Sequence, residues 1–107
     1  MNVTNWAQIS FDAGHAAPHD ETAANHGHRY LIRVYWQQVY DPRKPVKMDR
    51  AALAAIRDEL AGQVLDTMLP AVETTPAGIA AWILERIPSA SAAQVSADAD
   101  AATKVER

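Results

Sequence analysis

Strict alternation of apolar and polar residues marks two stretches in the first third of the chain. From residue 7 onward every second position lies on a mainly apolar side, which ends at His15. Alternation resumes at His26 and continues to Trp36, after residues 16–25, which lack the pattern and contain a proline. A period of two predicts strands with one buried face. The sequence therefore predicts two antiparallel strands joined by a loop.

Apolar spacings of three and four residues replace this alternation in the middle of the chain. Asp49 is a good N-cap, and the apolar pattern behind it predicts an amphipathic helix that Gly62 interrupts only weakly. Its apolar residues are Leu53, Ile56, Leu60 and Val64. A second helix is predicted to begin at Thr75-Pro76, an N-cap followed by proline at the first helical position, and to end before Pro88. Its apolar stripe consists of Ile79, Ile83 and Ile87.

Two further stretches complete the predicted architecture. Residues 46–48 are long enough for a short third strand. Residues 93–101 alternate again, which suits an edge strand, but their Ala, Ser and Asp content suits a disordered tail from about residue 100 equally well. The order β-β-(β)-α-α-β predicts a small α+β domain over residues 1–107, with two helices on one face of an antiparallel sheet.

Composition narrows the classes of function. The chain has 107 residues and a net charge of −3 without a block of like charges, so neither nucleic acid nor an anionic membrane is an expected partner. No apolar run approaches the ~20 residues of a membrane span, and the first residues do not resemble a signal peptide, so we expect a cytoplasmic protein. A chain this short buries a modest core, which makes oligomerisation a natural supplement.

The chain contains no cysteine, and its histidines are candidate metal ligands. Without thiolates, any metal must be held by His, Asp or Glu. His26 and His28 share one face of their strand, and a hairpin would bring His15 to the same end. Three histidines with an open fourth position are typical of a catalytic zinc site. The alternative is that histidines gather near a loop by chance.

The same residues resemble a known family. Phe-Asp-Ala-Gly-His at residues 11–15, followed by His-Gly-His-Arg-Tyr at residues 26–30, is similar to the two-part histidine motif of the 6-pyruvoyltetrahydropterin synthase family. Its bacterial branch, 6-carboxytetrahydropterin synthase, acts in queuosine biosynthesis. Weaker matches follow in the family's order, among them Asp49-x3-Leu53 and Leu65-Asp66.

This resemblance implies a fold, a cofactor and a reaction. The fold would be the tunnelling fold (T-fold), assembled into homo-oligomeric trimers or hexamers. His15, His26 and His28 would bind Zn²⁺, and Asp66 would stand at a catalytic position. The substrate would be a pterin, because the family's lyases convert dihydroneopterin triphosphate to a 6-substituted tetrahydropterin.

Several catalytic positions depart from the family's pattern. Thr22 stands near the position of the family's cysteine, and threonine is a poor base at neutral pH. Thr67 replaces the histidine that follows Asp66, and Ala97 replaces the glutamate that anchors the pterin. Nearby groups that could substitute are His19, Glu21, Glu73 and Asp98. The sequence therefore leaves open a catalytically altered or inactive paralogue that keeps zinc and binds a pterin, a purine-like ligand or a homologous subunit. It also leaves open a metal-free structural module.

Overall fold

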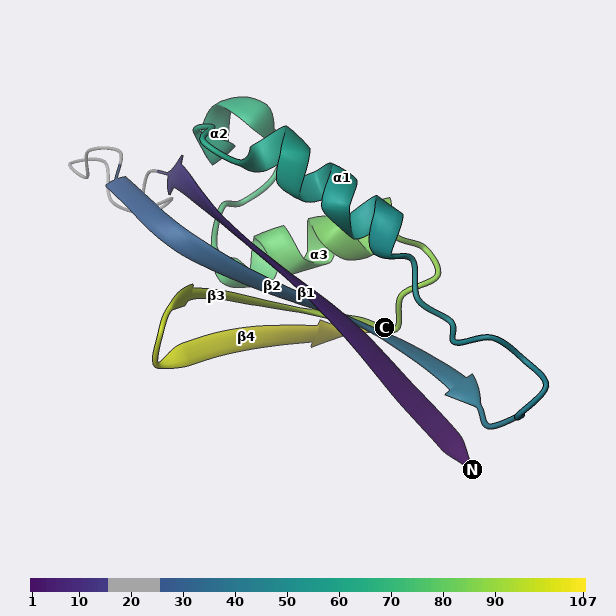
Figure 1. Ribbon diagram of the computed structural model, residues 1–107. Helices are drawn as coiled ribbons and strands as arrows, with labels where there is room; N and C mark the ends of the chain where they lie inside the picture. The colour runs from purple at the N-terminus through teal and green to yellow at the C-terminus, as the bar shows by residue number, and fades with distance from the viewer. Residues whose placement is uncertain (16–25) are drawn as a thin grey trace.

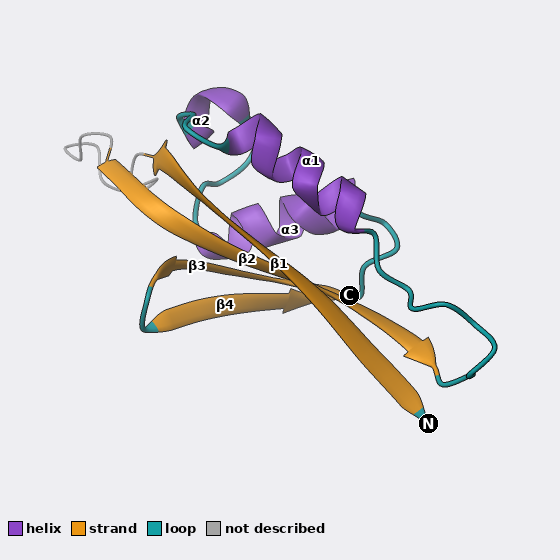
Figure 2. Cartoon of the chain, in the orientation of Figure 1, coloured by secondary structure: helices purple, strands orange, loops and turns teal. Residues whose placement is uncertain are grey.

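The computed structural model describes residues 1–15 and 26–107. Its elements are β1 (Asn2–His15), β2 (His26–Val39), α1 (Arg50–Leu60), α2 (Leu65–Met68), α3 (Pro76–Arg86), β3 (Ala92–Asp98) and β4 (Ala101–Glu106). The strands form one antiparallel sheet in the order β1-β2-β3-β4. Figures 1 and 2 show the helices on one face of this twisted sheet, with the other face uncovered. The predicted α+β class is confirmed.

The hairpin of β1 and β2 is the longest feature of the sheet. Its pairing runs without a break from Asn2 opposite Val39 to His15 opposite His26. The predicted period of two is confirmed, because the side chains that face the helices alternate with exposed ones. The buried ones are Ala7, Ile9, Phe11, Ala13, Tyr30, Ile32, Val34 and Trp36. β1 begins five residues before the predicted start at residue 7, in a stretch where no side chain is buried.

Helix α1 begins as predicted and ends earlier. The Asp49 side chain accepts a hydrogen bond from the backbone N–H of Ala52 at 3.0 Å, and Leu60 is the last residue of the helix. The prediction that the helical pattern continues to Val64 is wrong. Gly62 has a φ of +74°, a left-handed conformation that glycine adopts readily, so the chain turns there and Val64 instead precedes the short helix α2.

Helix α3 follows its sequence signals closely. The Thr75 hydroxyl accepts a hydrogen bond from the backbone N–H of Gly78 at 3.2 Å, and Pro76 occupies the first helical position. The helix ends at Arg86, before Pro88, as predicted. Ile79 and Ile83 are fully buried in the core. Ile87, just beyond the end of the helix, is buried with them.

Two predictions about strands are corrected. Residues 46–48 form no strand: the side chain of Gln38 accepts a hydrogen bond from the backbone N–H of Lys47, so a side chain takes the place of a strand partner. The alternation over residues 93–101 is not one edge strand. β3 ends at Asp98 and lies between β2 and β4, and the tail forms β4 instead of a disordered end. None of the helices in the described part of the chain is long and apolar enough to cross a membrane.

Candidate metal centre

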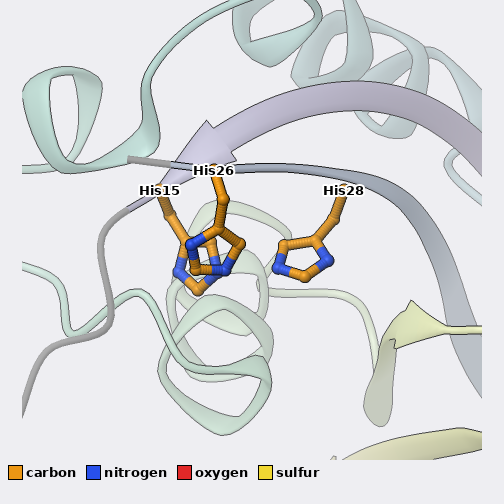
Figure 3. A group of neighbouring side chains, drawn as sticks. All are labelled: His15, His26 and His28. Carbon is orange, nitrogen blue, oxygen red and sulfur yellow. The ribbon is translucent and has the colours of Figure 1, made fainter. Parts of the chain in front are cut away.

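The three predicted histidines lie together at one end of the hairpin. His15 is the register partner of His26, and His28 lies two residues further along β2 on the same face. One nitrogen of each ring lies within 4.8 Å of the corresponding nitrogens of the other two. The ring centroids are 4.5 to 4.9 Å apart, and Figure 3 shows the rings gathered in one group. The structure thus brings together all three residues that the sequence singled out.

Backbone pairing holds the β1 end of this cluster in place. The N–H of Gly14 donates to the carbonyl of Gln63 at 2.9 Å, and the N–H of Gly62 donates to the carbonyl of Asp12 at 2.7 Å. The turn after α1 therefore runs beside the last residues of β1, and Gly14 forms an isolated parallel bridge with Val64. His15, the next residue, is fixed from one side by β2 and from the other by this turn.

His15 has the surroundings of a metal ligand. Both of its ring nitrogens are buried, and neither makes a hydrogen bond of normal geometry within the described residues. Burial lowers the pKa of His15, the positive charges of protonated His26 and His28 lower it further, and the Asp66 charge and the Thr74 backbone act in the opposite direction. A ring kept neutral offers the lone pair that a metal needs.

The cluster fits a tetrahedral ion. Zinc binds histidine nitrogen at about 2.0–2.1 Å, which places tetrahedral ligand atoms about 3.3 Å apart. The nitrogens of His15, His26 and His28 lie within 4.8 Å of one another, so they would have to approach by up to about 1.5 Å to bind one zinc ion. A metal ion would satisfy one of the two buried His15 nitrogens, which have no hydrogen-bond partner in the described part of the chain.

Tyr30 adds a buried hydroxyl beside the histidines. Its side chain is 1% exposed, its ring stacks on Phe11 at 5.7 Å, and its hydroxyl has no hydrogen-bond partner in the described part of the chain. Burial, followed by the negative charge of Asp66, raises the pKa of Tyr30 to about 12, so the hydroxyl stays protonated at neutral pH. In the sequence, Tyr30 has no assigned chemical role and is only the last residue of the histidine motif at residues 26–30. Its place two residues after His28 was the available signal.

We expect Tyr30→Phe to leave the metal-free protein as stable as the original or to stabilise it by up to about 1 kcal/mol, because it removes a buried donor without a partner. The free energy of unfolding in urea measures this. Tyr35→Phe is the control: the Tyr35 hydroxyl donates to Gln94 Oε1 at 3.0 Å, so its loss should destabilise the protein by about 0.5–1.5 kcal/mol. A larger loss of unfolding free energy in Tyr30→Phe than in Tyr35→Phe would contradict the conclusion that the Tyr30 hydroxyl lacks a hydrogen-bond partner.

Asp66 lies near the cluster but outside it. It is in the first turn of α2, and its Oδ1 accepts a hydrogen bond from the Thr74 hydroxyl at 2.7 Å. Its negative charge raises the pKa of Tyr30 and partly opposes the lowering of the pKa of His15. The group of described residues that could hold a metal comprises only the three histidines. Thr22, His19 and Glu21 lie outside the described residues.

Together, the antiparallel sheet, the helices on one of its faces and the three histidines define an α+β protein with a candidate trihistidine metal centre. A comparison with family models matches residues 5–105 to the model described as 6-pyruvoyl tetrahydropterin synthase. The match spans nearly the whole chain, so the chain belongs to the 6-pyruvoyl tetrahydropterin synthase family. The resemblance carried by the histidine motif is thereby confirmed.

Solved structures share the fold over the whole chain at low sequence identity. The 6-pyruvoyl tetrahydropterin synthase of Caenorhabditis elegans gives a TM-score of 0.81 at 17% identity, covering 100% of this chain and 96% of that one. The Plasmodium vivax enzyme gives 0.73 at 13%, covering 100% and 98%. A variant of the P. vivax enzyme in which a catalytic glutamate is replaced gives 0.64 at 12%, with the same coverage.

Identities this low show the fold alone, and that fold is the T-fold expected from the histidine motif. No curated protein sequence matches the chain.

Proposed function

We propose that this protein is a zinc-dependent lyase that converts dihydroneopterin triphosphate to a 6-substituted tetrahydropterin, as 6-carboxytetrahydropterin synthase does in queuosine biosynthesis. The convergence of His15, His26 and His28 carries the proposal, together with membership of the family. Zinc bound there would act as a Lewis acid on the oxygens of the substrate side chain. We further propose a cytoplasmic homo-oligomer, a trimer or hexamer, because oligomerisation adds buried surface to a short chain.

The protein's own residues must then move the protons. Asp66 is the described carboxylate beside the cluster, and the Thr74 hydroxyl holds it in place. In the P. vivax protein, the catalytic residue replaced in the variant is a glutamate, which is consistent with a carboxylate at the catalytic site. Glu21 is a second carboxylate, in the sequence segment that joins β1 to β2. We therefore propose that a carboxylate takes the place of the family's cysteine as the base.

A second candidate function is favoured by the side chains that this chain lacks. Thr67 directly follows Asp66, and Ala97, a residue of β3, corresponds by the sequence resemblance to the family's pterin-anchoring glutamate. A carboxylate facing ring N–H groups is a strong contact, and its loss weakens binding and discrimination. The alternative is a paralogue that binds zinc and a pterin, a purine-like ligand or a homologous subunit, with altered or no catalysis.

The experiment that separates the two is a zinc measurement followed by a turnover assay. The purified protein is analysed for zinc per chain, incubated with dihydroneopterin triphosphate, and the products are separated by liquid chromatography. One zinc per chain and a tetrahydropterin product that Asp66→Asn or Glu21→Gln reduces would support the lyase. Bound zinc without turnover would rule out the lyase and leave the paralogue. No bound zinc would refute both.

A further inference from the structure

Thr74 has an unusual position for a polar residue. Its side chain is 2% exposed, and aside from aromatic residues it is the one buried polar side chain in the described part of the chain. A buried hydroxyl is costly unless it makes a hydrogen bond, by about 1–3 kcal/mol in proteins. Thr74 also lies next to the first turn of α3, where Thr75 already serves as the N-cap. The burial of Thr74 is therefore not explained by helix capping.

The partner of the Thr74 hydroxyl is a charged group. Thr74 Oγ1 donates to Asp66 Oδ1 at 2.7 Å, which is the usual length for a hydroxyl bound to a carboxylate. The bond joins the start of α3 to the first turn of α2, eight residues earlier in the chain. It fixes one oxygen of Asp66 and so limits the directions in which the carboxylate can face.

Close backbone packing sets the position of Thr74. A Cβ atom at position 78 would overlap the carbonyl oxygen of Glu73, so only glycine allows this approach. The segment that contains Thr74 is therefore held against the first turn of α3 from both sides: Glu73 packs on Gly78, and the Thr75 hydroxyl accepts from the Gly78 N–H. Thr74, between them, has little freedom to move.

Asp66 lies beside the β1 end of the metal centre. Val64, the N-cap of α2, forms a bridge with Gly14, so Asp66 in the first turn of that helix lies near the end of β1 that carries His15. A histidine that binds a metal through one nitrogen usually presents its other N–H to a carboxylate or a backbone carbonyl, which sets the orientation of the ring. Asp66 supplies a carboxylate at this place.

We propose that Thr74 is a positioning residue of the metal centre: its hydroxyl holds Asp66 so that the carboxylate charge stays beside the three histidines. This inference rests on the proposed metal centre and deepens it. Nothing in the sequence pattern assigns a role to Thr74. The role follows from its burial, its bond to Asp66 and the packing of Glu73 on Gly78.

Zinc affinity of the full chain, measured by competition with a chelating indicator, tests the role of the hydroxyl. Thr74→Val keeps the shape and the backbone carbonyl but removes the donor, whereas Thr74→Ser keeps it. Since partners of metal ligands typically contribute about 10–100-fold to affinity, we expect Thr74→Val to weaken zinc binding about 10-fold and Thr74→Ser to stay within about threefold of the original. Thr4→Val, an exposed position near the other end of β1, is the matched control and should change nothing.

Unfolding of the metal-free variants separates positioning from a purely structural role. Thr74→Val should lose about 1 kcal/mol of stability without metal, the usual contribution of one hydrogen bond. If zinc affinity stays unchanged while stability falls, Thr74 is structural only and the inference is wrong. If Thr74→Val does not fold, Asp66→Asn provides the test, because it keeps an acceptor for Thr74 but removes the charge. Unchanged affinity in Asp66→Asn would also overturn the inference.

The outcome for the original protein separates this inference from the proposed function. If the unaltered chain binds no zinc, the metal centre and the positioning role are both wrong. If it binds zinc and Thr74→Val binds it equally well, the metal centre stands and only the role of Thr74 is rejected. In Co²⁺-substituted protein, the visible spectrum of Thr74→Val should differ from that of the original, because the orientation of a ligand has changed.

Discussion

His28→Ala is expected to abolish zinc binding at stoichiometric concentrations. Partners that only orient metal ligands contribute about 10–100-fold to affinity, so removing a ligand should cost more than about 100-fold. Two histidines would remain, and their nitrogens alone do not define a tetrahedral site. Competition with a chelating indicator, with metal analysis of the purified variant, measures the effect.

His19→Ala is the matched control for this loss. It makes the same chemical change at the one histidine of the chain that is outside the proposed ligand set. We expect it to bind zinc as the unaltered protein does. Equal zinc binding by His28→Ala and the unaltered protein would show that the cluster is not the metal site.

Gly78→Ala is expected to destabilise the protein, although the same change usually stabilises a helix. Alanine is favoured over glycine inside a helix by about 1 kcal/mol. At position 78 the added methyl group would overlap the carbonyl oxygen of Glu73, and overpacking of this kind costs about 1–3 kcal/mol, occasionally more. The free energy of unfolding in urea should therefore fall. Zinc affinity should fall with it, because the segment forced to move carries Thr74.

Ala81→Gly shows what helix propensity alone does in α3. Ala81 is exposed in the same helix, and we expect its replacement to lose about 0.5–1 kcal/mol by propensity and entropy. Alanine would then be favoured at position 81 and disfavoured at position 78. A gain of stability in Gly78→Ala would contradict the close contact between Glu73 and Gly78.

The parts of the fold that the sequence predicts are those with a regular apolar period. The core side chains of β1 and β2 repeat every second residue, and those of α1 and α3 every third or fourth, since in each element one face packs against the core. The histidines belong to the same periodicity. Because His26 and His28 share a face and His15 ends the neighbouring strand, a hairpin alone brings the three together.

The rest of the site depends on contacts between residues that follow no regular spacing in the sequence. Thr74 and Asp66 lie eight residues apart, across a turn and a four-residue helix, and no local pattern pairs them. In the sequence, Gly78 appears only as a residue that destabilises a helix. In the structure, its missing Cβ lets the Glu73 carbonyl approach the helix backbone. Residues 46–48 form no strand, because local extended character does not specify whether a partner strand is present. Tertiary packing decides each of these cases.

The turn after α1 also limits how the sheet can grow. β1 and β4 are the outer strands, and an outer strand offers backbone groups to which another chain can pair, in assembly or in aggregation. At the end of β1 these backbone groups are already hydrogen-bonded, because the Asp12 carbonyl and the Gly14 N–H bind the backbone at positions 62 and 63. A strand from another molecule that extends the sheet at β1 must therefore stop before Asp12, and the end of the hairpin that carries the histidines stays out of such pairing.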